Sequence, residues 1–288
     1  MSALHRMKIR FPRSRPSGIP RGGLAIAVLA CAVATIVVGI VGRPIWNPYW
    51  VSLTGGRTVE EAITALTDAR GRIVKATEDA GLDYPPAEVV LVAYKNERRL
   101  EIWGRASAAG ELANSATPPS IATITAPQTV LPAATDEFPW ICIGHRSILA
   151  ASGGPGPKLR EGDRQVPEGV YAIIGLNPNS AYHLSMKLDY PNADDRVRAA
   201  ADGRDDPGSN IFIHGRDRSI GCLAMGDPVI EELFVLVHDV GVDATKVVIA
   251  PHDPRAASLV PPSDAPAWTA ERYANIEAAI DRLTGVPR

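Results

Sequence analysis

Short runs of apolar residues predict most of the strands in this chain. Glu88–Tyr94 (EVVLVAY) and Arg99–Trp103 (RLEIW) have the length and the β-branched or aromatic content of strands, and Lys95–Arg98 is a tight turn between them. The remaining predicted strands are Phe138–Ile143, Gly169–Ile174, Tyr182–Leu188, Asn210–His214 and Val247–Ala250.

Capping residues and helical spacing predict the helices. Thr58 and Glu61 form a capping box at the start of a helix that we expect to end at Ala80, because Gly81 follows. Asp227, with Pro228 in the first turn, is the predicted N-cap of a helix through Val240. The other predicted helices are Asn192–Ala201 and Trp268–Leu283. Short strands with few intervening helices favour a β-rich α+β domain over a doubly wound α/β fold.

The N-terminal segment has the pattern of a membrane anchor. Leu24–Val41 contains no charged residue and would span about 27 Å as a helix, close to the thickness of a bilayer core. Residues 1–21 hold six basic residues and no acidic one, which predicts that this tail stays in the cytoplasm. A cleaved signal peptide is the alternative, although its apolar run is usually shorter. We expect a single-pass protein of the inner membrane with its main domain in the periplasm.

Charge and composition exclude several classes of protein. The net charge is −2, and the chain after residue 21 holds 24 basic against 32 acidic residues, so nothing favours nucleic acid as a partner. Three cysteines are too few for a disulfide framework. No phosphate-binding glycine motif is present, and we expect no cofactor. Residues 106–135, rich in Ala, Thr, Pro and Ser, are predicted to form a flexible insertion.

The segment from His214 to Cys222 (HGRDRSIGC) carries the clearest candidate chemistry. A thiol becomes a strong nucleophile when a nearby base removes its proton, and His214 reaches Cys222 if the loop between them folds back. Arg216 and Arg218 would add positive charge that favours the thiolate, and Ser219 would orient the loop or the imidazole. Gly221 leaves the backbone open, so amide groups beside Cys222 are expected to stabilise an oxyanion. On spacing alone, a buried cysteine beside an unrelated histidine is the alternative.

The other cysteines and histidines have simpler interpretations. Cys142 is predicted to be a buried strand residue, and His145 and His252 are predicted to lie in loops. His238 suits the negative end of a helix dipole. A zinc site would have to combine distant residues, and their spacing matches no compact ligand motif, so no metal is predicted. The set considered is His183, His214, Cys222 and His238.

Several separated stretches resemble the L,D-transpeptidase catalytic domain family (YkuD-like), and most closely its YafK-like branch. The stretches are Ser152–Ile173, Leu176–Arg196 and Ile211–Asp227, with Val92–Trp103 upstream. The resemblance implies a mixed β sandwich or barrel with peripheral helices, and a mechanism of cysteine acyl transfer. Cys222 matches the family nucleophile, His214 the base, and Ser219 and Gly221 the Ser-x-Gly-Cys core. Ile220 stands where the larger family has a second histidine, which puts any role for two histidines in doubt.

The resemblance also implies a substrate. Cys222 would attack the carbonyl that joins a diamino acid to the terminal D-Ala of a peptidoglycan stem peptide, and an amine of another stem peptide or of a wall-linked lipoprotein would resolve the thioester. A hydrolase that uses water instead, acting as a carboxypeptidase or amidase, is one alternative, and a non-catalytic peptidoglycan-binding module is another. The candidate substrate-binding residues are Arg216, Arg218, Tyr182, His183 and Lys158.

These inferences divide the chain into five regions, of which the first is the basic cytoplasmic tail at 1–21. The predicted anchor is 22–42, and a linker with an accessory helix follows at 43–87. The predicted catalytic domain is 88–252, and a helical segment at 253–288 completes the chain.

Overall fold

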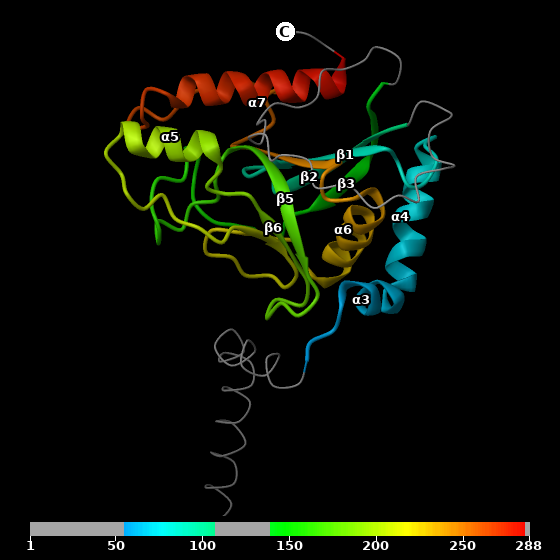
Figure 1. Ribbon diagram of the computed structural model, residues 1–288. Helices are drawn as coiled ribbons and strands as arrows, with labels where there is room; N and C mark the ends of the chain where they lie inside the picture. Colours follow the sequence, from blue (N-terminus) through cyan, green and yellow to red (C-terminus); the bar gives the residue numbers. More distant parts are fainter. Residues whose placement is uncertain (1–54, 107–138, 286–288) are drawn as a thin grey trace, which may run out of the picture. The chain divides into compact units, whose positions relative to one another are not determined.

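The computed structural model describes residues 55–106 and 139–285, and within them the strands form one mixed sheet (Figure 1). The strand order across the sheet is β3-β2-β1-β9-β5-β6-β7-β8-β4. The strands are β1 (Glu88–Tyr94), β2 (Arg99–Arg105), β3 (Ile141–Ser147), β4 (Ala150–Ala151), β5 (Gly169–Asn177), β6 (Ser185–Leu188), β7 (Phe212–His214), β8 (Leu223–Ala224) and β9 (Thr245–Ala250).

Strand β1 lies inside the sheet and is buried on both faces. It pairs antiparallel with β2 and parallel with β9. Val89 and Leu91 point into one apolar core, whereas Val90 and Tyr94 point into a second core on the opposite face. Because successive side chains in a strand alternate between faces, a strand covered on both sides is apolar at nearly every position.

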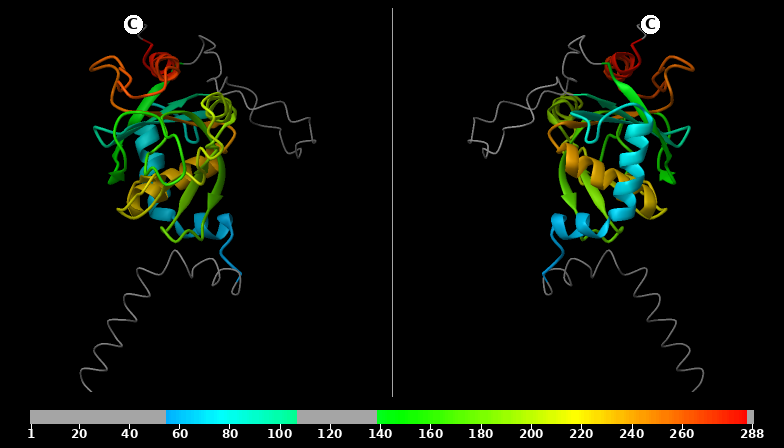
Figure 2. Two further views of the ribbon diagram at one scale, coloured as in Figure 1. Left: turned by 90° about the vertical axis from the view of Figure 1, so that its left-hand side faces the viewer. Right: turned by 90° about the vertical axis from the view of Figure 1, so that its right-hand side faces the viewer.

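Helices cover the two faces of this part of the sheet (Figures 1 and 2). Helix α6 (Asp227–Val240) lies under one face beside α4 (Thr67–Asp79), and α7 (Thr269–Thr284) lies over the opposite face against β9 and β5. Two shorter helices, α3 (Val59–Ala65) and α5 (Ala193–Ala201), complete the described helices. The α+β, strand-rich class predicted from the sequence is confirmed, and of the predicted sandwich or barrel the structure has a single sheet.

Most predicted elements are present, several strand ends differ by a few residues, and the short strands β4 and β8 were not predicted. The first predicted helix is two helices, because Leu66 adopts a ψ of 36° and ends α3 before α4 begins; the capping box of Thr58 and Glu61 is formed. Strand β3 begins later than predicted and runs on through His145. Asp227 is the first residue of α6 rather than its N-cap, which is Gly226.

The predicted anchor at 22–42 and nearly all of the predicted insertion at 106–135 lie outside the described residues. Within the part of the chain that the structure describes, no helix is both long enough and apolar enough to cross a membrane. The anchor therefore stays a prediction from the sequence.

A buried ion pair joins the sheet to the loop that precedes β5. Lys95 Nζ lies 2.9 Å from Glu168 Oε1, and both side chains are almost fully buried. Lys95 also donates to the carbonyl oxygens of Gly154 and Val166. Glu168 accepts from the Gly156 amide and from the Tyr273 hydroxyl of α7. These hydrogen bonds give both charged groups further partners, and they fix the loop of residues 154–168.

Replacing Glu168 by Ala should destabilise the protein strongly, because the Lys95 ammonium would be left buried without its partner. The expected loss in the free energy of unfolding is about 3–5 kcal/mol. Denaturant unfolding of the full-length chain, followed by circular dichroism, measures it. The matched control is Asp79→Ala, which breaks the exposed pair with Lys75 and should leave the unfolding midpoint unchanged. Equal effects of the two substitutions would contradict this account of the buried pair.

Candidate functional site

The pairing of β7 with β8 places the segments that carry His214 and Cys222 side by side. The two strands are parallel, with Ile213 opposite Leu223 and His214 opposite Ala224. Ile213 and Leu223 both point into the core against α6. Because side chains alternate along a strand, His214 points to the other face, and Cys222 directly precedes β8. The loop 215–222 therefore folds back, whereas contact of His214 with the Cys222 thiol stays a prediction.

Ser219 organises the loop between the two strands. Its hydroxyl oxygen accepts from the amides of Gly221 (3.3 Å) and Cys222 (2.8 Å), and its hydroxyl donates to the Cys222 carbonyl at 2.6 Å. The predicted role of Ser219 as a loop-orienting residue agrees with these contacts. The prediction that these amides stabilise an oxyanion needs correction, because the Gly221 and Cys222 amides already donate to the Ser219 hydroxyl oxygen.

His214 is buried and has a defined tautomer. Its Nδ1 lies 2.6 Å from the Gly215 carbonyl oxygen, and since a carbonyl only accepts, Nδ1 carries the proton. The lone pair of the neutral ring is then on Nε2, which is the atom able to accept a proton from a thiol. The Tyr182 ring covers the imidazole at a centroid distance of 4.6 Å. Burial lowers the pKa of His214, so the ring is neutral at neutral pH.

The Cys222 thiol is half-buried against the main chain of β7. Its Sγ lies 3.9 Å from the Asn210 carbonyl oxygen. Burial raises the pKa of Cys222, while a backbone hydrogen bond at Phe212 and the charge of Lys158 lower it in part. The resting pair is therefore a neutral thiol and a neutral imidazole. Within the described residues, no hydrogen bond joins the thiol to His214, a separation common in catalytic groups before substrate binds.

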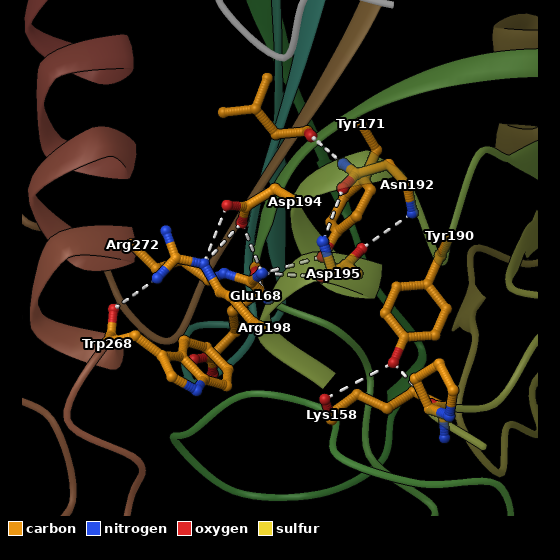
Figure 3. A network of polar contacts seen from close by, with 12 residues as sticks. Lys158, Glu168, Tyr171, Tyr190, Asn192, Asp194, Asp195, Arg198, Trp268 and Arg272 are labelled. Carbon is orange, nitrogen blue, oxygen red and sulfur yellow. Dashed lines mark hydrogen bonds and ion pairs between the residues drawn. The ribbon is translucent and has the colours of Figure 1, made fainter. Parts of the chain in front are cut away.

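Lys158 contributes charge to the site from a buried position. Its Nζ pairs with Asp163 at 2.6 Å and donates to the Arg160 carbonyl at 2.9 Å. Its carbonyl accepts from the Tyr190 hydroxyl (Figure 3). The ammonium is thus held by the protein, and its influence on Cys222 is electrostatic. The sequence predicted that Arg216 and Arg218 favour the thiolate, but both side chains are exposed. The cation that lowers the pKa of Cys222 is Lys158.

A second group of polar contacts fixes the segment that leads to Asn210. Arg272 of α7 pairs with Asp194 (2.7 Å) and Asp195 (2.8 Å) of α5, and its guanidinium lies over the Trp268 ring (Figure 3). The Tyr190 hydroxyl also donates to the Pro207 carbonyl at 2.6 Å. Helix α5 is therefore held to α7, and the Tyr190 hydroxyl fixes the chain at Pro207.

Of the remaining predicted substrate-binding residues, Arg218 is exposed, and the other three have defined contacts. Tyr182 contacts the imidazole directly. The neighbouring His183 has a φ of 75° and is held by Glu231 of α6, with Nε2 and Oε1 2.8 Å apart. Arg216 is paired with Asp227 at 3.2 Å. Contact of any of these residues with a substrate stays a prediction.

Two predictions for residues outside the site were wrong, and the zinc candidates are dispersed. Cys142 is exposed on β3 rather than buried, and His145 lies in the same strand rather than in a loop. His183 and His238 face Glu231 and Asp239. Across residues 55–106 and 139–285, no group of three or more His, Cys, Asp or Glu side chains is arranged to hold a metal ion.

Two contacts at the site were not predicted from the sequence. Asp227 was interpreted only as a helix cap, but its Oδ1 accepts from the Arg216 amide at 2.8 Å. The Asn210 carbonyl is the hydrogen-bond partner of the thiol. Neither contact has a local sequence signal, because the first joins residues eleven positions apart and the second uses a main-chain atom.

Comparison with known families finds a match to one family over part of this chain. Residues 134–249 match the model of the L,D-transpeptidase catalytic domain, YkuD. This span includes both His214 and Cys222, and it confirms the resemblance of that part of the chain to the family.

Two individual relatives match this chain over part of their length. YafK of Escherichia coli K12, whose name assigns it only provisionally to the L,D-transpeptidases, is 43% identical over 92 residues, which are 31% of this chain and 35% of that protein. YafK of strain O157:H7 matches equally. The matched segment thus spans about a third of these relatives.

Two solved structures are weakly similar. The helical cell shape determining protein Pgp2 from Campylobacter jejuni has a TM-score of 0.37 and 18% identity, covering 58% of this chain and 48% of its own. Bd1075 from Bdellovibrio bacteriovorus has a TM-score of 0.35 and 16% identity, covering 69% and 56%.

The raised pKa of Cys222 predicts slow alkylation at neutral pH. Because the thiolate is the reactive form, the iodoacetamide rate at Cys222 should rise with pH to a midpoint above that of an ordinary thiol, about 8.5. Peptide mass spectrometry of the full-length chain follows each cysteine separately. A midpoint below 7 would show instead a thiolate–imidazolium pair at rest.

Proposed function

We propose that this protein is a membrane-anchored cell-wall enzyme that transfers an acyl group of a peptidoglycan stem peptide through Cys222. The observation that carries the proposal is the parallel pairing of β7, which ends at His214, with β8, which directly follows Cys222, inside the span that matches the L,D-transpeptidase catalytic domain. The defined tautomer of His214 supports it, because the basic nitrogen is Nε2.

The proposed reaction has two halves. In the first, His214 Nε2 takes the proton of the Cys222 thiol, and the sulfur attacks the carbonyl that joins the diamino acid to D-Ala. The C–N bond breaks, the imidazolium gives its proton to the departing D-Ala amine, and a thioester remains. In the second, an acceptor amine loses a proton to His214 and attacks the thioester. The C–S bond breaks, an amide forms, and the sulfur recovers its proton from the imidazolium.

The surroundings of the pair support a reaction that starts from neutral groups. The buried imidazole and the raised thiol pKa mean that charge develops only when proton transfer and attack are coupled. Lys158, held by Asp163, offers a fixed positive charge on the thiolate side as the sulfur becomes negative. A fixed charge in a partly buried site stabilises such a state without reorganisation.

The location and the acceptor are part of the same proposal. The apolar run at Leu24–Val41 with its basic flank would hold the enzyme at the inner membrane with the domain in the periplasm. Amines of other stem peptides are the proposed acceptors, with a wall-linked lipoprotein as a further one.

The reaction is tested by incubating the full-length chain with a disaccharide tetrapeptide that ends in D-Ala, followed by mass spectrometry. Loss of D-Ala with formation of a crosslinked dimer is the expected result. Cys222→Ala should abolish it, and His214→Ala should lower turnover by about 10²–10⁴ because the general base is lost. Cys142→Ala is the matched control and should keep full activity, because that thiol lies on β3 outside the site.

The other outcomes separate the alternative functions. A trimmed tripeptide with no dimer would assign a hydrolase that uses the same cysteine. Binding of peptidoglycan without any Cys222-dependent product, including with protein-bearing cell wall, would indicate a non-catalytic binding module. Normal turnover in His214→Ala would reject His214 as the base.

A further inference from the structure

Asp227 faces the main chain that follows His214. It is the first residue of α6 and comes directly after the N-cap Gly226. One carboxylate oxygen accepts from the Arg216 amide at 2.8 Å, and the other lies 3.2 Å from the Arg216 guanidinium. The carboxylate therefore binds the backbone as well as the side chain of the same residue.

A single peptide unit links this carboxylate to the imidazole. The Gly215 carbonyl and the Arg216 amide belong to one planar group, so the orientation of one fixes the orientation of the other. The carbonyl end accepts from His214 Nδ1 at 2.6 Å, and the amide end donates to Asp227 at 2.8 Å. Hydrogen bonds in such a chain polarise one another, and a charged acceptor at the end strengthens the others.

We propose that Asp227 is a positioning residue for His214 and acts through the Gly215–Arg216 peptide. Its carboxylate orients the carbonyl that fixes the proton on Nδ1, and its charge favours the protonated ring that forms during the reaction. In a Ser-His-Asp triad the carboxylate touches the imidazole directly. Here it acts at a distance of one peptide unit. The consequence for turnover rests on the proposed function, whereas the effect on the imidazole does not.

The local packing shows that this geometry is closely specified. A side chain at Gly215 would lie 2.7 Å from Asp227 Oδ1 and 2.7 Å from the Tyr182 carbonyl, so only glycine fits. Arg216 has a φ of 61°, which is unfavourable for a residue with a side chain. Its amide is held by Asp227, and its carbonyl accepts from the Gly226 amide at 2.9 Å. Both sides of the strained residue are thus fixed by the start of α6.

Stabilisation of α6 and an ion pair are simpler roles for Asp227, and they leave the backbone contact unexplained. A carboxylate in the first turn suits the helix dipole, but it need not bind an amide eleven residues upstream. The Arg216 side chain is 43% exposed, so its ion pair contributes little. Around His214 lie Tyr182 from the β5–β6 segment, which contacts the ring, and Asp227 with Arg216 behind the Gly215 peptide.

The test is an NMR titration of His214 in the full-length chain, labelled with ¹⁵N-histidine and kept in a non-denaturing detergent. His214→Gln assigns the signal. Asp227→Asn keeps an oxygen acceptor for the Arg216 amide but removes the charge, so the pKa of His214 should fall by at least about half a unit. Asp227→Ala removes the acceptor too, and the ring should then lose its preference for a proton on Nδ1.

Two variants exclude the simpler roles. Asp239→Asn removes a carboxylate–arginine contact at the other end of α6, so it should cost stability without moving the titration of His214. Arg216→Ala removes the ion pair but keeps the amide, and the pKa of His214 should not fall. An unchanged His214 titration in Asp227→Asn, or an equal fall in Arg216→Ala, would overturn the proposal.

Kinetics connect the inference to the proposed function, and this measurement, unlike the titration, depends on it. Asp227→Asn should lower kcat about tenfold with little change in KM, and the acid limb of the pH–rate profile should move to lower pH. A fall in kcat with the acid limb unmoved would indicate a merely structural role and would count against the proposal. If the titration shifts as expected but no stem peptide is turned over by the unmodified protein, the positioning role stands and the proposed function fails.

Discussion

The parallel pairing of β7 with β8 is the constraint on which the site depends. Parallel neighbours usually need a connection of a dozen or more residues, because the chain must reverse its direction twice. Here the connection is the eight residues 215–222. A loop this short brings Cys222 beside the strand that ends in His214. It also leaves little room for regular hydrogen bonding, so side chains must satisfy the backbone groups of the loop. The segment 214–222 therefore forms the tight loop and also carries both candidate catalytic residues, His214 and Cys222.

Two polar side chains bind backbone amides of this loop, one near each of its ends. Ser219 binds the amides of Gly221 and Cys222, and Asp227 binds the amide of Arg216. A Cβ at Gly221 would lie 3.8 Å from the Gln165 carbonyl oxygen, so the loop before β5 lies beside this segment. The buried pair of Lys95 and Glu168 holds that loop, and α7 contributes the Tyr273 hydroxyl.

The sequence predicted elements well where one local rule decided the outcome. The apolar run Glu88–Tyr94 is a strand with the predicted bounds, and Thr58 with Glu61 forms the predicted capping box. Prediction failed where tertiary contacts decide. Cys142 looked buried from its apolar neighbours, but its strand β3 is at the edge of the sheet. Asp227 has the local pattern of a helix cap, and only the fold shows that its carboxylate binds the chain beside His214. The amides beside Cys222 were expected to be free because sequence does not show where a serine hydroxyl points.

The Asp227 carboxylate is separated from His214 by one peptide unit, and this separation helps to explain why His214 and Cys222 are both neutral at rest. A carboxylate in direct contact with a buried imidazole would raise its pKa strongly and favour a thiolate–imidazolium pair at all times. A permanent thiolate is the form most easily oxidised, which is a cost for an enzyme outside the cytoplasm, where we propose this one acts. With the carboxylate one peptide unit away, burial still dominates and lowers the pKa of His214. The orienting effect on the ring does not need direct contact, because a rigid planar group transmits it. In the proposed reaction, the same segment would keep its thiol protonated until a substrate carbonyl is in place.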